Sequence, residues 1–392
     1  MSTATSFVVE ELRSGLESLL QQTTCPLPVG DFVDQMIGLL AQHRVTDLHL
    51  RPQQTQWVMT CRYTGQVHSL VSLEQGFGQQ VVSRLKVMAS LLTYQSDQPQ
   101  EGRLETSRCP QQVRLSTFPT IHGEAACLRF LQPRSHQTSL VDLGYPEPVT
   151  QSLCHQLHAT DGAVLFTGPA GSGKTTSAYA CLEWMNRQTA QHRAIHTLED
   201  PIEFFCDDYS QTQVDGRTHL TLANAIKSVV RQDPDVILVG EIRDPAVAEL
   251  TFQTALSGHL VLSTFHAGSC AAAIHRLFDY GIAPHLMLSA LRSLLNQRLI
   301  HTQNEHATLI AESIPLAEDS LRVAIREQQP VSQLQQLAEK TGMISLHQQA
   351  RQFLAEGRIA QKELVRVLGP DVMTTNPNWP DSITAQTDEG ER

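Results

Sequence analysis

The chain has 392 residues, enough for about two or three domains, and its 41% hydrophobic and 18% charged residues are typical of a globular protein. Its 29 lysines and arginines against 40 aspartates and glutamates give a net charge of -11, which argues against broad electrostatic binding to nucleic acid or anionic membrane. No run approaches the roughly 20 apolar residues of a membrane span, and no secretory signal opens the sequence. The 8 cysteines form no C-x-x-C pair, which disfavours the usual zinc and thioredoxin sites. These features predict a soluble, cytoplasmic protein.

Helix and strand patterns alternate irregularly over the first third of the chain. Residues 1–28 are predicted to be a helical segment, because apolar residues such as Leu12 and Leu16 recur at helical spacing. Residues 29–132 are predicted to form a small α+β domain. Its expected elements are helices over 31–43 and 77–92 and strands over 47–50, 57–63 and 102–131, the last interrupted at Pro119.

The remaining two thirds read as a different kind of domain. Residues 133–150 are rich in proline and are predicted to be an interdomain linker. From 151 to 370, short apolar runs at 163–167, 236–239 and 260–263 alternate with helical patterns, which predicts an α/β domain with a parallel sheet covered by helices on both faces. Residues 371–392 are polar and aperiodic, and they are predicted to be a disordered tail.

A complete G-x-x-x-x-G-K-[ST] pattern follows the first of these apolar runs and precedes a predicted helix over 176–186. Its glycines allow backbone N–H groups to turn around phosphate oxygens, and the helix amino terminus adds a positive dipole. Lys174 is expected to reach the β- and γ-phosphates, and the Thr175 hydroxyl to bind Mg²⁺. The predicted nucleotide-binding residues are Gly168, Pro169, Ala170, Gly171, Ser172, Gly173, Lys174, Thr175 and Thr176.

Carboxylates follow two other predicted strands. Glu241 ends the apolar run that starts at Val236, and strand ends in a parallel sheet face the ligand, so Glu241 is a candidate catalytic residue. The alternative is that Glu241 caps a helix. Glu199, Asp200 and Glu203 crowd around a proline, which is costly unless a cation such as Mg²⁺ lies among them. Glu199 is also a catalytic candidate, and the alternative is an exposed acidic turn.

Two of the 17 histidines, His259 and His266, flank the apolar strand over 260–263. His266 is predicted to fall near the nucleotide edge, and both histidines are candidates for sensing the γ-phosphate or positioning water. The alternative is that they are surface or hydrogen-bonded structural residues. A metal site formed by this pair is not expected, since no third ligand stands at a suitable spacing.

These segments, namely the phosphate loop, the acidic box 198–203, the strand ending in Glu241 and the histidine box 258–266, occur in one order along the chain. In that order they resemble the type II secretion and type IV pilus assembly ATPases of the GspE/PilB type. The first domain continues the resemblance, with Thr-Asp-Leu-His-Leu at 46–50, Ser-Arg-Leu-Lys-Val-Met-Ala at 83–89, Gln-Pro-Gln-Glu-Gly-Arg at 98–103 and a further match over 113–124.

The resemblance implies a P-loop (RecA-like) ATPase domain joined to a smaller N-terminal α+β (PAS-like) domain. It implies ATP and Mg²⁺ as ligands, a homohexameric ring, and an inner-membrane platform protein as partner, with peripheral attachment to the membrane. It also implies that Arg103 and Arg114 of the first domain reach the nucleotide, since guanidinium groups suit phosphate oxygens. The alternative for these two arginines is an ordinary role in surface ion pairs.

The chain departs from that family in several places. It resembles a short form without the long N-terminal domain and without the tetracysteine zinc loop. The usual Thr-Leu-His-Thr of the histidine box reads Thr264-Phe265-His266-Ala267. The stretch from Gly342 to Leu346 resembles the assembly branch, so the expected function is an ATPase motor that powers filament assembly. Alternatives are a retraction ATPase, a nucleotide-binding scaffold with weak hydrolysis, or a motor on nucleic acid, which the acidic charge disfavours.

Overall fold

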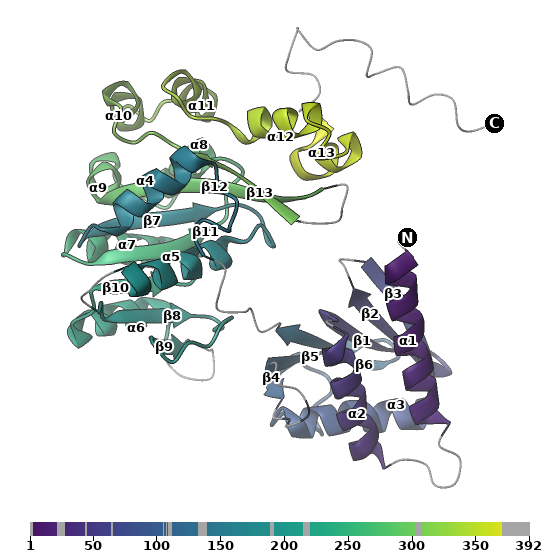
Figure 1. The fold of residues 1–392 in the computed structure, drawn as a ribbon. Coiled ribbons are helices and arrows are strands. Elements are labelled where there is room, and N and C mark those ends of the chain that lie inside the picture. Colours follow the sequence, from purple (N-terminus) through teal and green to yellow (C-terminus); the bar gives the residue numbers. More distant parts are fainter. Residues whose placement is uncertain are drawn as a thin grey trace. The chain divides into compact units, whose positions relative to one another are not determined.

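The computed structural model describes residues 3–21, 28–43, 45–63, 66–104, 106, 108, 112–131, 139–188, 192–214, 220–302 and 307–370. The chain divides into two compact units, Met1–Ser135 and His136–Arg392, each of which is described by itself (Figure 1). The predicted tail over 371–392 lies outside the described residues.

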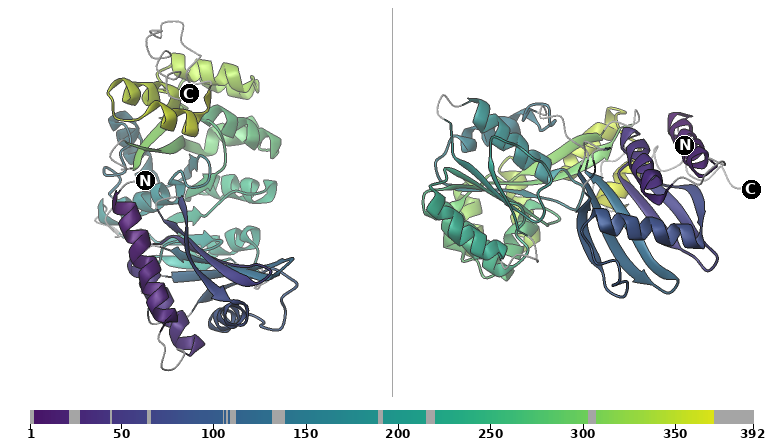
Figure 2. Two further views of the ribbon diagram at one scale, coloured as in Figure 1. Left: turned by 90° about the vertical axis from the view of Figure 1, so that its right-hand side faces the viewer. Right: turned by 90° about the horizontal axis from the view of Figure 1, so that it is seen from below.

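The first unit is a six-stranded antiparallel sheet with the strand order β3-β2-β1-β6-β5-β4. Three helices cover one of its faces (Figure 2). Its elements are α1 (Thr3–Leu20), α2 (Val29–Gln42), β1 (Asp47–Pro52), β2 (Gln56–Tyr63), β3 (Gln66–Glu74), α3 (Gln75–Met88), β4 (Gln100–Leu104), β5 (Gln112–Thr120) and β6 (Gly123–Leu131).

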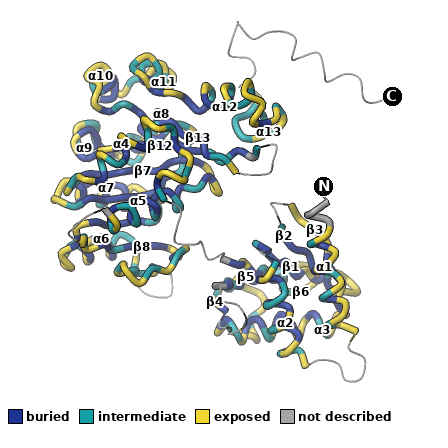
Figure 3. Tube along the Cα trace, viewed as in Figure 1, coloured by how far each residue is buried: buried dark blue, intermediate teal, exposed yellow. Residues whose placement is uncertain are grey.

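Alternation along the strands builds the core of this unit. In β1, Leu48 and Leu50 are fully buried beneath the helices, whereas Arg51 is exposed on the other face (Figure 3). Leu12 and Leu16 of α1 are fully buried in the same core. The helix predicted within residues 1–28 is therefore part of this unit and packs with the elements that follow it.

Two predicted boundaries in the first unit differ from the structure. The helix expected over 77–92 ends at Met88, because Ser90 adopts a left-handed backbone with φ of 56°. Pro119 does not interrupt its strand, which runs on to Thr120. The pairing of β5 with β4 ends at Thr117, so the missing N–H of Pro119 removes no bond to that neighbour.

The second unit contains a seven-stranded sheet with the order β13-β12-β7-β11-β10-β8-β9, parallel except for β13. Its elements are α4 (Glu147–Leu157), β7 (Gly162–Thr167), α5 (Lys174–Gln188), β8 (Ile195–Glu199), β9 (Ser210–Gln213), α6 (Leu222–Val229) with a 3₁₀ turn (Val230–Gln232), β10 (Val236–Val239), α7 (Pro245–Leu256), β11 (Leu260–Phe265), α8 (Cys270–Asp279), α9 (Pro284–Ala290), β12 (Leu291–His301), β13 (Ala307–Ser313), α10 (Asp319–Arg326), α11 (Val331–Lys340), α12 (Leu346–Ala355) and α13 (Gln361–Leu368).

Each central strand contributes to two hydrophobic cores, one on each face of the sheet. In β7, Ala163 and Leu165 pack with the group of helices that includes α7 and α8, while Val164 and Phe166 pack with α4 and α5. All four side chains are fully buried. This confirms the predicted doubly covered parallel sheet and explains why its strands read as continuous apolar runs.

The segment predicted as a linker is only partly a connection. Leu140 and Tyr145 are buried in the core shared with α4 and α5. Helix α4 begins at Glu147, within the predicted linker, with Pro146 at its N-cap position and Pro148 in its first turn. Proline is compatible with the first turn of a helix, so Pro146 and Pro148 mark a helix start and not a linker.

None of the described helices is both long enough and apolar enough to cross a membrane. The C-terminal helices α12 and α13 form a small core of their own with Ile300 of β12 and Ile310 of β13.

A buried ion pair joins α3 to β6 in the first unit. Lys86 is 1% exposed, and its Nζ donates to both carboxylate oxygens of Glu124 and to the carbonyl of Gln95, each at 2.8 Å. The substitution Lys86→Met leaves a carboxylate without its cation, and we expect it to lower the free energy of unfolding by about 3 kcal/mol, measured by urea denaturation followed by tryptophan fluorescence.

The double variant Lys86→Met/Glu124→Leu is the control for this prediction. It replaces both charges with apolar groups, so it should recover most of the lost stability. Equal stability of Lys86→Met and the unsubstituted protein would show that the pair does not hold the two elements together.

Candidate functional site

The carboxyl ends of β7, β8, β10 and β11 lie along one edge of the parallel sheet in the second unit. Strand register sets Thr167 beside Phe265 and Val239 beside both Leu198 and Ser263. The residues that follow these strand ends are the phosphate loop, the acidic box, Glu241 and His266. The topology thus brings motifs that are far apart in the sequence to a single edge.

The phosphate loop turns tightly between β7 and α5. Gly168, Gly171 and Gly173 have φ of 144°, 74° and 88°, a region that favours glycine. At Gly168, a Cβ would lie 2.5 Å from the Gln297 carbonyl oxygen and 2.6 Å from Ser172 Oγ. The loop therefore requires glycine for both its backbone angles and its close packing against β12.

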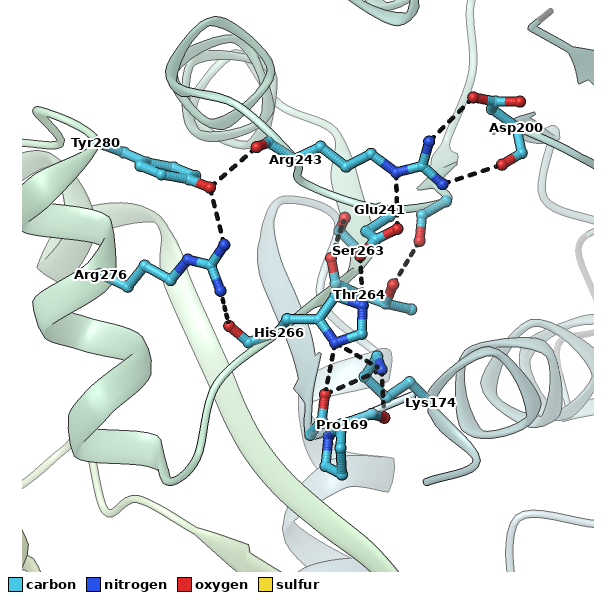
Figure 4. Close-up of polar contacts among 12 residues, drawn as sticks. Pro169, Lys174, Asp200, Glu241, Arg243, Ser263, Thr264, His266, Arg276 and Tyr280 are labelled. Atoms are coloured by element: carbon cyan, nitrogen blue, oxygen red, sulfur yellow. Dashed lines mark hydrogen bonds and ion pairs between the residues drawn. The ribbon is translucent and has the colours of Figure 1, made fainter. Parts of the chain in front are cut away.

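Lys174 is the first residue of α5 and is 8% exposed. Its Nζ donates to the carbonyl oxygens of Gly168 at 3.0 Å and Pro169 at 2.8 Å, and it lies 3.5 Å from His266 Nδ1 (Figure 4). Burial lowers the pKa of Lys174, while the charge of Glu241 opposes that effect. The ammonium group thus rests on loop carbonyls, and oxygens of a bound phosphate can replace them.

A chain of polar contacts links Lys174 to the acidic box. His266 Nδ1 lies 3.0 Å from the Gly168 carbonyl oxygen, and its Nε2 lies 2.8 Å from Glu241 Oε1. Arg243 donates from Nε to Glu241 Oε2 at 2.8 Å and from Nη1 to Asp200 Oδ2 at 3.1 Å (Figure 4). Glu241 therefore sits between a histidine and an arginine, and its side chain is 21% exposed.

Helix α8 braces this chain from the side. Arg276 donates to the His266 carbonyl oxygen at 2.6 Å, and its guanidinium lies 5.1 Å from the Phe265 ring centre. Tyr280 donates to the Arg243 carbonyl oxygen at 3.0 Å. Both backbone segments that present the charged side chains are thereby held by α8 or the residue after it.

The three carboxylates of the acidic box have different surroundings. Glu199 is 2% exposed, and its Oε1 accepts from Tyr179 Oη at 2.6 Å and from Thr197 Oγ1 at 2.7 Å. Burial raises the pKa of Glu199, and these two hydrogen bonds lower it. Asp200 pairs with Arg243, and Glu203 is exposed.

Hydroxyl donors stabilise Glu199, and a guanidinium stabilises Asp200. These partners supply stabilisation that the sequence argument assigned to a cation alone, and Mg²⁺ among the three carboxylates stays a prediction. Tyr179 lies on α5, 20 residues before Glu199, so no local sequence pattern announces it.

Among the predicted site residues of the second unit, His259 lies at the opposite edge of the sheet from the others. It precedes β11, whereas His266 follows it, and a six-residue strand separates their ends by about 20 Å. His259 Nδ1 lies 3.1 Å from Ser257 Oγ at the far edge of the sheet. Because the two ends of a strand lie at opposite edges of the sheet, His259 does not share the edge of Glu241 in this chain, and its catalytic role stays a prediction.

Arg103 and Arg114 lie on β4 and β5 of the first unit. They are directly opposite in the antiparallel register, and Arg114 is opposite Arg129 of β6. The three arginines therefore share one face of this sheet, in neighbouring strands.

Two polar side chains of β12 support the site and were not among the predicted site residues. Asn296 donates to Thr167 Oγ1 at 2.8 Å and to the Ala267 carbonyl oxygen at 3.0 Å. Gln297 donates to the Ser172 carbonyl oxygen at 2.8 Å. Gln297 begins the sequence Gln-Arg-Leu at 297–299, which carries no local sign of its contact with the phosphate loop.

The loop suits a phosphate group on a further ground. Ser172 Oγ is buried, and within the described residues it has no hydrogen-bond partner. Thr175, in the first turn of α5, is half-buried and also carries a hydroxyl. These donors and the helix amino terminus fit a nucleotide phosphate, and the Thr175 hydroxyl fits the oxygen ligation that Mg²⁺ prefers.

A family model described as "Type II/IV secretion system protein" matches residues 24–308. The chain is 32% identical over 365 residues to the type II secretion system protein HxcR of Pseudomonas aeruginosa, covering 87% of this chain and 77% of that protein. It is 36% identical over 277 residues to the type II secretion system ATPase E of Vibrio cholerae, covering 70% of this chain and 54% of that protein.

Among solved structures, the pilus retraction motor PilT with bound ADP aligns with a TM-score of 0.68 at 24% identity, covering 85% of this chain and 96% of that one. The X-ray structure of the Legionella pneumophila ATPase DotB aligns with a TM-score of 0.68 at 18% identity, covering 86% and 94%. These alignments confirm the predicted fold class. The chain spans little more than half the length of several of the secretion proteins that it matches.

The hydroxyl of Tyr179 stabilises ionised Glu199, which gives a prediction for stability against pH. The folded-state pKa of Glu199 is raised, and the substitution Tyr179→Phe removes a hydrogen bond that lowers it, so the pKa should rise further. We expect a loss of about 1–2 kcal/mol in unfolding free energy at pH 8 and a smaller loss near pH 5, where Glu199 binds a proton more readily. Urea denaturation at several pH values measures both.

Tyr209→Phe is the matched control, since Tyr209 lies beside Tyr179 and Cys206 but does not contact Glu199. Its effect should be the same at both pH values. A pH-independent loss in Tyr179→Phe would contradict the assigned interaction.

Proposed function

The chain belongs to the type II/IV secretion system protein family, and from this premise we propose that it is an ATP-hydrolysing motor that powers assembly of a type II secretion pseudopilus or a type IV pilus-like filament. One observation carries the proposal. The buried Lys174 on the phosphate loop is linked through His266 to Glu241, and through Arg243 to the acidic box. A binding loop and a candidate catalytic carboxylate therefore form one connected site.

In the proposed reaction, the triphosphate of ATP occupies the loop from Gly168 to Thr175. Backbone N–H groups and the α5 amino terminus bind its oxygens, and Lys174 moves from the carbonyls of Gly168 and Pro169 to the phosphates. Mg²⁺, when bound, would be held by Thr175 and, through water, by Glu199, Asp200 and Glu203, and would neutralise phosphate charge. Thr176 adds a further hydroxyl in the same turn.

Glu241 is proposed to orient and polarise the water that attacks the γ-phosphorus, with ADP and inorganic phosphate as products. Its two carboxylate oxygens contact His266 and Arg243, so at least one of these contacts must open before Glu241 can hold water. His266 also contacts the Gly168 carbonyl oxygen. It is therefore suited to report the γ-phosphate to Glu241.

The wider assembly is proposed from the family alone. The protein is expected to act as a homohexamer that attaches peripherally to the inner membrane through a platform protein, in the cytoplasm and without a nucleic-acid partner. Arg103 and Arg114 are proposed to bind the nucleotide and to release it after hydrolysis, when the charge that they hold is lost.

The substitution Glu241→Gln tests the catalytic assignment. It preserves the shape of the side chain but removes its negative charge, so nucleotide binding should persist while turnover falls about 100-fold or more. Calorimetric titration of a non-hydrolysable ATP analogue and a phosphate-release assay measure the two effects. The variant Lys174→Ala is the control that should lose binding itself. Unchanged turnover in Glu241→Gln would move the carboxylate role to Glu199 or Glu203.

The substitution Arg114→Ala tests whether the first unit takes part in hydrolysis. We expect turnover of the full chain to fall at least about tenfold, since an arginine on a transferring phosphoryl group contributes strongly to the rate. Arg51→Ala, an exposed arginine on the same sheet, is the matched control and should leave turnover unchanged. Equal rates in the two variants would assign Arg114 to an ordinary surface role.

A further inference from the structure

The residues just before α4, in the second unit, are connected to the supports of the phosphate loop by one side chain. Residues 139–146, here called the junction segment, precede α4 and carry Leu140 and Tyr145 into the core formed with α4 and α5. Tyr145 is 7% exposed although it bears a hydroxyl. A buried hydroxyl requires partners, and those of Tyr145 lie in the supports of the loop.

The Tyr145 hydroxyl contacts both supports. It donates to Gln297 Oε1 at 2.6 Å and is hydrogen-bonded to Ser177 Oγ at 2.8 Å. A phenol has one hydrogen, so the Ser177 hydroxyl donates in the second contact. Burial raises the pKa of Tyr145, which keeps the phenol protonated and able to donate.

Both partners of the Tyr145 hydroxyl, Gln297 and Ser177, are themselves hydrogen-bonded to the phosphate loop. Gln297 Nε2 donates to the Ser172 carbonyl oxygen at 2.8 Å, and the same nitrogen lies 3.3 Å from where a Cβ on Gly173 would stand. The Ser177 backbone N–H donates to the Gly173 carbonyl oxygen at 3.0 Å. The hydroxyl of Tyr145 therefore connects the junction segment to two consecutive loop residues by two separate routes.

We infer that Tyr145 is a positioning residue that couples the junction segment to the conformation of the phosphate loop, so that nucleotide binding tightens residues 139–146 within the second unit. This inference rests on the proposed function, because it concerns the same nucleotide. When the loop closes on phosphate, the Ser172 and Gly173 carbonyls are held in place. Through its hydrogen bonds, the Tyr145 hydroxyl then restricts the motion of residues 139–146 as well. The aromatic ring supplies packing, and the hydroxyl supplies the coupling.

Hydrogen exchange in the full chain tests this inference. A saturating non-hydrolysable ATP analogue should slow amide exchange in peptides covering 139–157 of the unsubstituted protein. In Tyr145→Phe, which keeps the ring but leaves Gln297 Oε1 without its donor, the analogue should still bind but should slow this exchange about threefold to tenfold less. The KM for ATP should rise by a similar factor, with kcat within about twofold.

Two variants keep the test decisive. Ser177→Ala removes one route and leaves the Gln297 contact, so it should give a smaller loss of protection and serves as the second test if Tyr145→Phe does not fold. Tyr63→Phe removes a phenol hydroxyl from the first unit and should match the unsubstituted protein in both measurements.

Equal protection of 139–157 by the analogue in the unsubstituted protein, Tyr145→Phe and Ser177→Ala overturns the coupling and leaves the proposed function standing. A loss of thermal stability with unchanged KM and unchanged protection likewise assigns Tyr145 to packing alone. Failure of the unsubstituted protein to bind the analogue overturns the proposed function and the inference together.

Discussion

The site depends on one constraint, which is that the ammonium group of Lys174 is buried and must be surrounded by oxygen atoms. In the structure, these oxygens are the carbonyls of Gly168 and Pro169, which the glycine-rich turn directs inward. Desolvation of a cation is costly, so the loop and the lysine stabilise each other only while such acceptors are present. A phosphate group offers stronger acceptors of opposite charge at the same place, and this difference is the physical basis for nucleotide binding.

The loop is supported from two directions, and the two supports differ in chemistry. On the strand-end side, His266, Glu241 and Arg243 form a charged and partly exposed chain that can rearrange. On the β12 side, Gln297 and Tyr145 form a buried, neutral network that can be disrupted only at the cost of unpaired polar groups. A buried neutral support and a partly exposed charged one suit a loop that must hold a triphosphate and respond when it is cleaved.

Much of this could be predicted from the sequence. Local sequence patterns identify the phosphate loop, the apolar strands and Glu241. The doubly covered sheet follows from apolar runs that alternate with helices. The partners of Glu199 and the hydroxyl contacts of Tyr145 could not, because Tyr179 and Gln297 reach them from other elements of the fold. His259 is a different case: it flanks the same strand as His266, although the strand itself holds its two ends apart.

The most direct measurement is a crystal structure of the protein with Mg²⁺ and a non-hydrolysable ATP analogue. The account predicts that Lys174 Nζ leaves the carbonyl oxygens of Gly168 and Pro169 and contacts phosphate oxygens, with Ser172 Oγ also engaged. A structure in which the nucleotide binds elsewhere, while Lys174 remains on those two carbonyls, would contradict it.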